Sequence, residues 1–349
     1  MRRHFKSIWV VFVCLVFISN APGAIRVVAW NCANHPNNTT QDGYFRTILE
    51  AIGDESVNGI AKRLDILVMS EMDDSSALRL VNILNTLYSV NTYTPVLSTS
   101  AGGDKTGVIY DSSTVTLIRS EDLTSIGIHP ILRAQFLPGG STAANEQFTI
   151  YAIHLKSGDT PADKSQRSVE AANLRANADS LGQGTAIIYA GDFNLNGSSE
   201  GAWPAMLAPG SGQAFDPADT PGDWRDDPAF IQLHSQDPGG SLDDRFDFQF
   251  ITDELMDDSG IEYVDGSFHV FGNNGTHTLN STITTGTGAS TTVLNALTQV
   301  SDHLPVVADY EIVQEPGSDL TLKQQIIQRI NQLELELTQL RTLVDQLPD

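Results

Sequence analysis

Five short apolar segments, each bounded by a polar residue of a catalytic type, constrain the fold of this chain most. The segments and their polar residues are 25–30 with Asn31, 64–70 with Glu71, 148–153 with His154, 186–191 with Asp192, and 304–307 preceded by Ser301-Asp302-His303. Uninterrupted runs of β-branched and aliphatic residues are typical of strands buried on both faces. In layered α/β proteins such strands open into loops where functional side chains converge. The pattern therefore predicts an α/β fold with one site built from strand ends.

Helical periodicity fills the intervals between these strands. Apolar residues recur at spacings of three and four over 45–52 and again over 80–87, and 168–181 is typical of a third helix with a polar face. Two long segments, 202–240 and 272–292, are rich in Gly, Pro, Asp, Ser, Thr and Asn and are predicted to be loops that border the site.

The polar residues resemble, in their order along the chain, the motifs of the endonuclease/exonuclease/phosphatase superfamily. The matching positions are Asn31, Glu71, His154, Gly-Asp-Phe-Asn at 191–194, Arg-x-Asp-Phe at 245–248 and Ser-Asp-His at 301–303. The resemblance spans residues 25–312. It implies a four-layer α/β sandwich of two packed β-sheets flanked by helices, and metal-dependent hydrolysis of phosphate esters. It also matches Asp247 to the family acid that holds the catalytic histidine.

The same residue types are suited to phosphate ester hydrolysis independently of the family resemblance. A phosphodiester is a stable anion, so its hydrolysis requires charge neutralisation, deprotonation of a water and stabilisation of the leaving alkoxide. Mg²⁺ binds few hard oxygen ligands and keeps several waters. We therefore expect Glu71 to bind the ion, with Asn31 and Asp302 beside it. Mn²⁺ or Ca²⁺ could occupy the same oxygen donors.

The remaining members of the set are candidates for proton transfer and phosphate binding. His303 can act as a general base while neutral, and Asp247 would fix its tautomer. His154 is expected to donate to the leaving group or to a non-bridging oxygen, and Asn194 to hydrogen-bond the phosphate. Asp192 would orient the water or share in deprotonating it. Either Asp192 or His303 can take the proton.

Other acids and histidines are interpreted as lying outside the site. Four histidines in polar, loop-like surroundings are expected to be solvated: His129, His234, His269 and His277. Asp243 and Asp244 are expected to form a surface pair. Asp104 could orient His154, as an acid does in the pancreatic-type enzymes, but it is not counted among the site residues.

The charge balance limits how the chain can bind nucleic acid. It contains 43 acidic and only 20 basic residues, which gives a formal net charge of −23. Tight non-specific binding of nucleic acid normally depends on Lys and Arg clusters, and the sequence shows none. The composition argues against processive DNA binding, but not against hydrolysis, because a divalent ion neutralises charge locally.

Residues 1–24 have the features of a signal peptide. A basic start is followed by an apolar stretch over 8–18 and by small residues suited to cleavage. The stretch is too short for a comfortable membrane span, so no stable membrane insertion is expected; an uncleaved signal anchor is the alternative. We predict a secreted or periplasmic protein. Cleavage would remove Cys14 and leave Cys32, an expected packing residue, without a disulfide partner.

The C-terminal part predicts a linker over 313–319 and a coiled-coil helix over 320–349. Apolar residues alternate at spacings of four and three: Ile326, Ile330, Leu333, Leu337, Leu340, Val344 and Leu347. Opposite charges at Arg329 and Glu334, and at Glu336 and Arg341, favour parallel association between chains. This predicts a homo-dimer or homo-trimer through 320–347; a helix that packs on its own domain is the alternative.

Together these patterns predict an exported, Mg²⁺-dependent phosphoesterase with a catalytic domain over 25–312, acting on a phosphodiester and most simply on nucleic acid. The alternatives are a sphingomyelinase-like enzyme, another small-substrate phosphodiesterase or phosphatase, and a catalytically silent binding module displayed on a coiled coil. Departures from relatives are visible: no Lys closely follows Glu71, and Leu195-Asn196 replaces the Asn-x-Arg sequence of inositol phosphatases.

Overall fold

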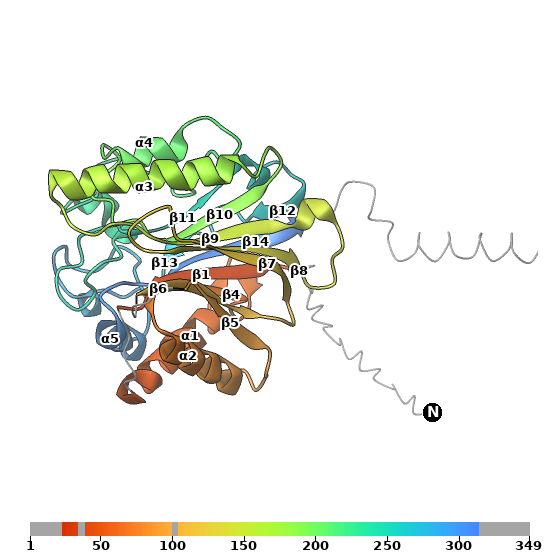
Figure 1. Ribbon diagram of the computed structural model, residues 1–349. Coiled ribbons are helices and arrows are strands. Elements are labelled where there is room, and N and C mark those ends of the chain that lie inside the picture. Colours follow the sequence, from red (N-terminus) through yellow and green to blue (C-terminus); the bar gives the residue numbers. More distant parts are fainter. Residues whose placement is uncertain (1–22, 34–38, 100–103, 314–349) are drawn as a thin grey trace, which may run out of the picture.

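The computed structural model describes residues 23–33, 39–99 and 104–313 (Figure 1). The predicted signal peptide lies outside the described residues except for Gly23 and Ala24. The predicted linker lies outside them except for Val313, and the predicted coiled-coil helix lies outside them entirely.

The first sheet has seven strands in the order β12-β14-β1-β4-β6-β5, and β13 pairs with β14 beside this path. Its strands are β1 (Ile25–Asn31), β4 (Ile66–Met72), β5 (Tyr93–Leu97), β6 (Lys105–Asp111), β12 (Gly260–Tyr263), β13 (His269–Val270) and β14 (Val306–Val313). Central β1 lies parallel to β4 and antiparallel to β14. Every residue of β1 is buried, as its uninterrupted apolar run predicts.

The second sheet has five strands in the order β11-β10-β9-β8-β7. They are β7 (Val115–Leu123), β8 (Ile131–Pro138), β9 (Phe148–His154), β10 (Ala186–Asp192) and β11 (Asp247–Ile251). Strands β9 and β10 are parallel, and the other pairs are antiparallel. A separate small hairpin joins β2 (Ser56–Val57) to β3 (Ile60–Ala61).

Helices cover the outer face of each sheet (Figure 1). The first sheet carries α1 (Asp42–Asp54), α2 (Asp74–Leu87) and α5 (Thr291–Val300), and the second carries α3 (Pro161–Asp179) and α4 (Ala202–Leu207). Short 3₁₀ helices span Thr39–Gln41, Ala144–Glu146, Pro228–Leu233, Asp253–Leu255 and Ile283–Thr285. The layers run helix, sheet, sheet, helix, which confirms the predicted four-layer sandwich. None of the described helices combines the length and apolar character needed to span a bilayer.

Two apolar cores hold the layers together. The larger fills the space between the sheets and beneath α1, α2 and α5. The smaller lies between the second sheet and α3 and α4. Here Trp203 packs tilted on Trp224 and edge to face on Phe250, and the Phe248 and Phe250 rings stack. Gln249 of β11 also joins the sheets, because its side-chain amide donates hydrogen bonds of 3.0 Å to backbone carbonyls of both β1 and β14.

The predicted helices over 45–52 and 80–87 are confirmed as parts of α1 and α2, whereas α3 begins at Pro161 instead of Ser168. Its first turns carry no apolar periodicity, but Thr160 forms a capping box with Asp163. Helix α5 was not predicted, and α4 interrupts a segment that was predicted to be loop. Cys32 is fully buried, and this burial raises the pKa of its thiol, which confirms it as a packing residue.

Candidate active site

The first sheet brings three of the predicted site residues to one edge. Strands β1 and β4 are parallel, so Asn31 and Glu71 end at the same side of the sheet. Strand β14 runs antiparallel to β1, so His303, which precedes it, lies at that side too. The Trp30 indole fixes this arrangement by donating a 2.9 Å hydrogen bond to the His303 carbonyl.

The second sheet brings the other residues to the matching edge. Parallel β9 and β10 end in register, with His154 opposite Asp192. Antiparallel β11 begins at Asp247, which pairs with Asp192. Since the two sheets pack face to face, both sets of strand ends meet at one place.

Local backbone irregularities aim two of these side chains. The pairing of β4 with β6 shifts register between Met69 and Met72, and Glu71 within this bulge has a φ of 52°. Bulges re-aim side chains next to active sites. Asn194 likewise has a φ of 51°, and its backbone N–H donates to Asp192 Oδ1 at 2.8 Å. The site therefore stores some backbone strain at the residues that face it.

Gly191 allows Asp192 to reach its position. It has a φ of 137°, and a Cβ built there would lie 2.2 Å from the Ile153 carbonyl oxygen of the neighbouring strand. Only glycine tolerates both the dihedral angle and this close approach. The first residue of the Gly-Asp-Phe-Asn sequence is therefore a steric requirement of the β9–β10 contact.

Substitution Gly191→Ala should lower the free energy of unfolding by more than the roughly 1–3 kcal/mol typical of a strained backbone position, because a backbone clash is added. Urea titration measures the loss. Gly184→Ala is the matched control, since Gly184 has a φ of 78° and a methyl group added there would meet no atom within 4 Å. Equal losses in the two variants would show that the approach to Ile153 is not limiting.

Asn31 holds two carboxylates together. Its Nδ2 donates to Glu71 Oε1 at 3.1 Å and to Asp192 Oδ2 at 3.0 Å, and its Oδ1 accepts from the Ala33 N–H at 2.9 Å. In this orientation the amide nitrogen faces the carboxylates, whereas the predicted ligand role uses the amide oxygen. Through its amide nitrogen, the Asn31 side chain links the Glu71 and Asp192 carboxylates in this structure.

His154 lies between two sets of acids. Its Nε2 is 3.7 Å from both Glu71 Oε1 and Asp192 Oδ2, and its Nδ1 is 3.3 Å from Asp104 Oδ1. Burial alone would lower the pKa of His154, but the hydrogen bond with Asp104 and the charges of these acids raise it. Asp104 therefore takes the orienting place that the sequence suggested for it.

His303 and Asp247 form a buried pair. His303 Nδ1 lies 2.8 Å from Asp247 Oδ2, and its Nε2 lies 3.7 Å from Asp192 Oδ2. Ser235, which was not predicted, also donates to Asp247 Oδ2 at 2.7 Å. Burial raises the pKa of Asp247. Burial would lower the pKa of His303, but the charges of Asp247 and Asp192 raise it well above its ordinary value.

Asn194 and Asp302 lie at the margins of this arrangement. The Asn194 amide is nearly buried and donates to the Leu155 carbonyl at 3.1 Å. Asp302 is exposed, and the hydrogen bonds that join Asn31 to its two carboxylates do not reach it. Its charge nonetheless contributes to the raised pKa of His303.

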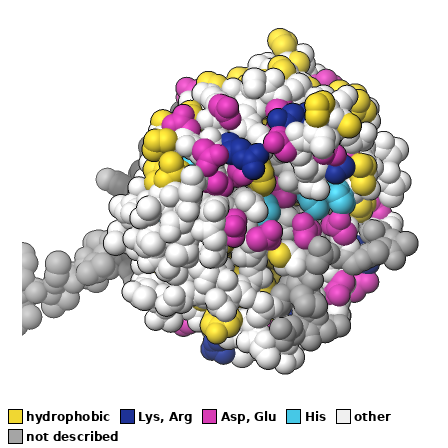
Figure 2. Space-filling model, turned by 90° about the vertical axis from the view of Figure 1, so that its left-hand side faces the viewer, with side chains coloured by type: hydrophobic (Ala, Val, Ile, Leu, Met, Phe, Trp, Pro, Cys, Tyr) yellow, Lys and Arg dark blue, Asp and Glu magenta, His cyan; other side chains and the backbone are white. Residues whose placement is uncertain are grey.

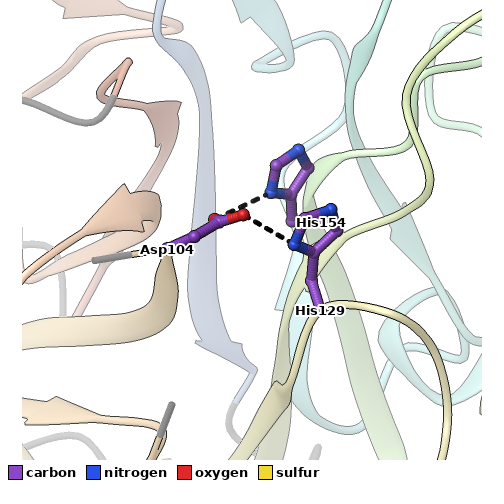
Figure 3. A group of neighbouring side chains, drawn as sticks. All are labelled: Asp104, His129 and His154. Atoms are coloured by element: carbon purple, nitrogen blue, oxygen red, sulfur yellow. Dashed lines mark hydrogen bonds and ion pairs between the residues drawn. The ribbon is translucent and has the colours of Figure 1, made fainter. Parts of the chain in front are cut away.

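One residue of the site, His129, was predicted to be solvated, and that prediction is wrong. Its Nδ1 lies 2.6 Å from Asp104 Oδ2, and its ring stacks on that of His154 with centroids 4.1 Å apart and planes 12° apart (Figure 3). No sequence signal marks His129, because it lies in the loop before β8 and meets its partners only through tertiary packing.

Other predictions of solvation also fail. His234 is fully buried and its Nε2 lies 2.8 Å from the Trp224 carbonyl, and His277 is buried beside it. His269 is only half-buried and pairs with Glu55. Asp244, predicted to lie on the surface with Asp243, is 4% exposed. Long loops fold over these side chains, which local composition does not reveal.

The donor set fits a hard divalent cation. Glu71 and Asp192 place carboxylate oxygens within hydrogen-bonding distance of one Asn31 amide group, and the Glu71 side chain is 22% exposed. Two converging carboxylates repel each other unless a cation or proton intervenes. Oxygen donors with room for waters are what Mg²⁺ prefers.

The surroundings are acidic. On the face in Figure 2, Asp and Glu side chains gather around the exposed His side chains, and Lys and Arg are few. The described basic residues near the site are paired with acids: Lys156 lies 3.1 Å from Asp163, and Lys164 and Arg225 both contact Asp159. These cations are already neutralised, so a bound anion gains little from them.

Comparisons with known proteins agree with the geometry. The profile of the "Endonuclease/Exonuclease/phosphatase family" matches residues 28–303. A protein of this family from Bacteroides vulgatus is 14% identical with a TM-score of 0.53, and the match covers 83% of this chain and 99% of that one.

Two further solved structures are similar. For D. rerio TDP2 complexed with single strand DNA product, the identity is 15%, the TM-score 0.51 and the coverage 82% of this chain and 99% of that one. For the human Nocturnin catalytic domain with bound sulfate anion, the identity is 17% and the TM-score 0.50, and the match covers 83% of this chain and 95% of that one. At these identities the likeness establishes the fold alone. No curated protein matches the sequence.

Proposed function

Because the chain belongs to the endonuclease/exonuclease/phosphatase family, whose members are phosphoester hydrolases, we propose that it is a Mg²⁺-dependent phosphodiesterase that acts as a nuclease. The observation that carries this proposal is the convergence of two carboxylates and two imidazoles. Glu71 and Asp192 share the Asn31 amide, while His154 and His303 each place Nε2 3.7 Å from Asp192 Oδ2.

These contacts support a position for the cation between the two carboxylates. Glu71 and Asp192 would hold it, and it would neutralise phosphate charge and lower the pKa of a bound water. The Asn31 amide keeps both carboxylates in position. Asp302 is retained as a candidate that reaches the ion through water.

The histidines and Asp192 have separate roles in binding the phosphate and transferring protons. Asp247 holds the His303 ring through Nδ1, so Nε2 faces Asp192 and the proposed phosphate position. The raised pKa of His303 favours a positively charged ring that contacts a non-bridging oxygen. Asp192 then orients the water and accepts its proton. His154, held through Nδ1 by Asp104, donates from Nε2 to the leaving oxygen.

Two observations bear on the substrate, one that supports nucleic acid and one that disfavours a long duplex. The similar D. rerio protein was solved with a single strand DNA product, which supports nucleic acid. The acidic surroundings and the paired basic residues disfavour a long duplex. We therefore propose short or single-stranded nucleic acid. A small diester is the second candidate, which the same acidic surroundings favour.

The decisive experiment measures hydrolysis by the protein without residues 1–24. Plasmid DNA, single-stranded DNA, RNA, sphingomyelin and bis-p-nitrophenyl phosphate are compared with Mg²⁺ and with EDTA. We expect Mg²⁺-dependent cleavage of bis-p-nitrophenyl phosphate and of single-stranded nucleic acid in preference to plasmid. Turnover of sphingomyelin alone would assign a lipid substrate, and no turnover of any diester would leave a binding module.

We also propose that residues 1–24 direct export and that 320–347 assemble the chain. Both rest on the sequence patterns. Amino-terminal sequencing of the accumulated protein tests the first, with a start near residue 25 expected.

Truncation after Val313 should yield a monomer with unchanged activity on a small diester, because all the proposed site residues precede the linker. Sedimentation of the full-length and shortened proteins measures the change. The full-length chain should associate weakly to moderately, since about three heptads are few.

Two double variants of the full-length protein test whether the apolar seam causes association, without removing any residues. Leu333→Glu with Leu340→Glu places charges in the apolar seam, whereas Gln332→Glu with Gln339→Glu adds the same charges outside it. Only the first pair should dissociate the assembly. A full-length chain that is monomeric at high micromolar concentration would instead favour a helix that packs on its own domain.

A further inference from the structure

Three side chains from separate parts of the fold form a cluster that the proposed reaction does not fully use. Asp104 immediately precedes β6, His129 lies in the loop before β8, and His154 ends β9 (Figure 3). One ligand atom from each residue lies within 4.8 Å of the other two. We call these three residues the Asp104–His129–His154 cluster.

The cluster and the proposed Mg²⁺ site lie on opposite edges of one imidazole ring. His154 Nε2 faces Glu71 and Asp192, each at 3.7 Å, while its Nδ1 faces Asp104. An ion bound through Nδ1 would therefore not compete for the carboxylates at Nε2. The two sites are distinct but share His154.

We propose that the Asp104–His129–His154 cluster binds a transition-metal ion of the Zn²⁺ class. Two imidazole nitrogens and one carboxylate oxygen make a donor set that Zn²⁺ favours, whereas Mg²⁺ prefers oxygen alone. Three protein ligands leave a fourth position for water.

Two of the three side chains of the cluster are exposed enough for an ion to reach them from solvent. The side chain of His154 is 5% exposed, whereas those of His129 and Asp104 are 19% and 33% exposed. One ligand is thus anchored in the protein, and the other two border solvent. The stacked rings both direct Nδ1 to the same carboxylate, so the ion would take the place of the protons that Asp104 now accepts.

Asp104 is suited to this exchange. Its carboxylate faces both imidazoles through separate oxygens, with Oδ2 2.6 Å from His129 Nδ1 and Oδ1 3.3 Å from His154 Nδ1.

Binding at this cluster should reduce turnover, a consequence that rests on the proposed function. A metal on Nδ1 fixes the His154 ring and prevents it from carrying protons on both nitrogens. Zn²⁺ would then inhibit hydrolysis of bis-p-nitrophenyl phosphate even at saturating Mg²⁺.

The test is calorimetric titration of the tag-free protein without residues 1–24 with Zn²⁺ in saturating Mg²⁺. His129→Ala should weaken binding by more than the roughly 10–100-fold that loss of an outer-shell partner costs, because it removes a ligand. His269→Ala is the matched control: its Nε2 also faces a carboxylate, Glu55, at 3.2 Å, but among the described residues no second imidazole is stacked on it. His269→Ala should bind Zn²⁺ with the same affinity as the unchanged protein.

Co²⁺ provides a second readout that does not depend on activity. Its absorption spectrum should show a low-coordinate site with nitrogen ligands in the unchanged protein and in His269→Ala, and lose it in His129→Ala. Unchanged Zn²⁺ affinity and Co²⁺ spectrum in His129→Ala would overturn the proposal. If Zn²⁺ binds as expected but no diester is hydrolysed, the metal site stands and the proposed function fails.

Discussion

Substitution of Glu71 by glutamine should lower metal-dependent turnover by about 10³ while the fold stays intact. The change preserves shape but removes one of the two converging charges that would hold the cation. Loss of one electrostatic contact to a transition state costs about 10²–10³ in kcat, and we expect the upper end of this range because affinity for the ion falls too. Hydrolysis of bis-p-nitrophenyl phosphate across a Mg²⁺ series measures both effects.

Glu55→Gln is the matched control for this experiment. The Glu55 side chain is 21% exposed, almost the same as the 22% of Glu71, but it pairs with His269 away from the site. It should leave turnover unchanged, and thermal melting of both variants checks the fold. If Glu71→Gln kept full activity and full Mg²⁺ affinity, Glu71 would not be the ligand.

Replacement of His154 by alanine should lower the rate by about 10²–10⁴, the usual effect of losing a positioned acid. Replacement of His303 should lower it by about 10²–10³, the usual effect of losing a charge-stabilising contact to the reacting group. His154→Ala and His303→Ala each remove a ring whose Nε2 lies 3.7 Å from Asp192. The measurement is kcat on the small diester at saturating Mg²⁺, with His269→Ala as a control that loses an imidazole outside the site.

Asp247→Asn should act in the same step as His303→Ala, because the two side chains share a 2.8 Å hydrogen bond. Residues that act as a unit show non-additive losses. The double variant should therefore be scarcely slower than His303→Ala alone. A loss equal to the product of the two single losses would mean that the residues act independently and would refute the pair.

Much of the fold could be predicted because buried strands carry a local signal. The strands over 148–154 and 186–192 begin and end where the apolar runs do, and β1 ends at Asn31 as expected. Helix boundaries were harder to predict. The first turns of α3 are held by the Thr160 capping box and not by apolar periodicity, so its start was placed too late.

The site could be predicted only in part, because its residue types carry a local signal and their hydrogen-bond partners do not. Polar residues at strand ends were visible in the sequence, and the parallel β1–β4 and β9–β10 pairs bring them together. The roles of hydrogen-bond partners were not visible. Ser235 lies on a loop and yet donates to Asp247, and the Asn31 amide turns its nitrogen toward the carboxylates.

The sequence by itself determined the layered fold, the family and the chemical types at the strand ends, because burial periodicity and short motifs are local properties. Only the tertiary structure decided which side chains share a partner. His129 and Asp104 come from loops 25 residues or more from His154 in the chain, and they meet it because β6, β8 and β9 are brought together across the two sheets. That convergence depends on long-range packing, which no local pattern encodes.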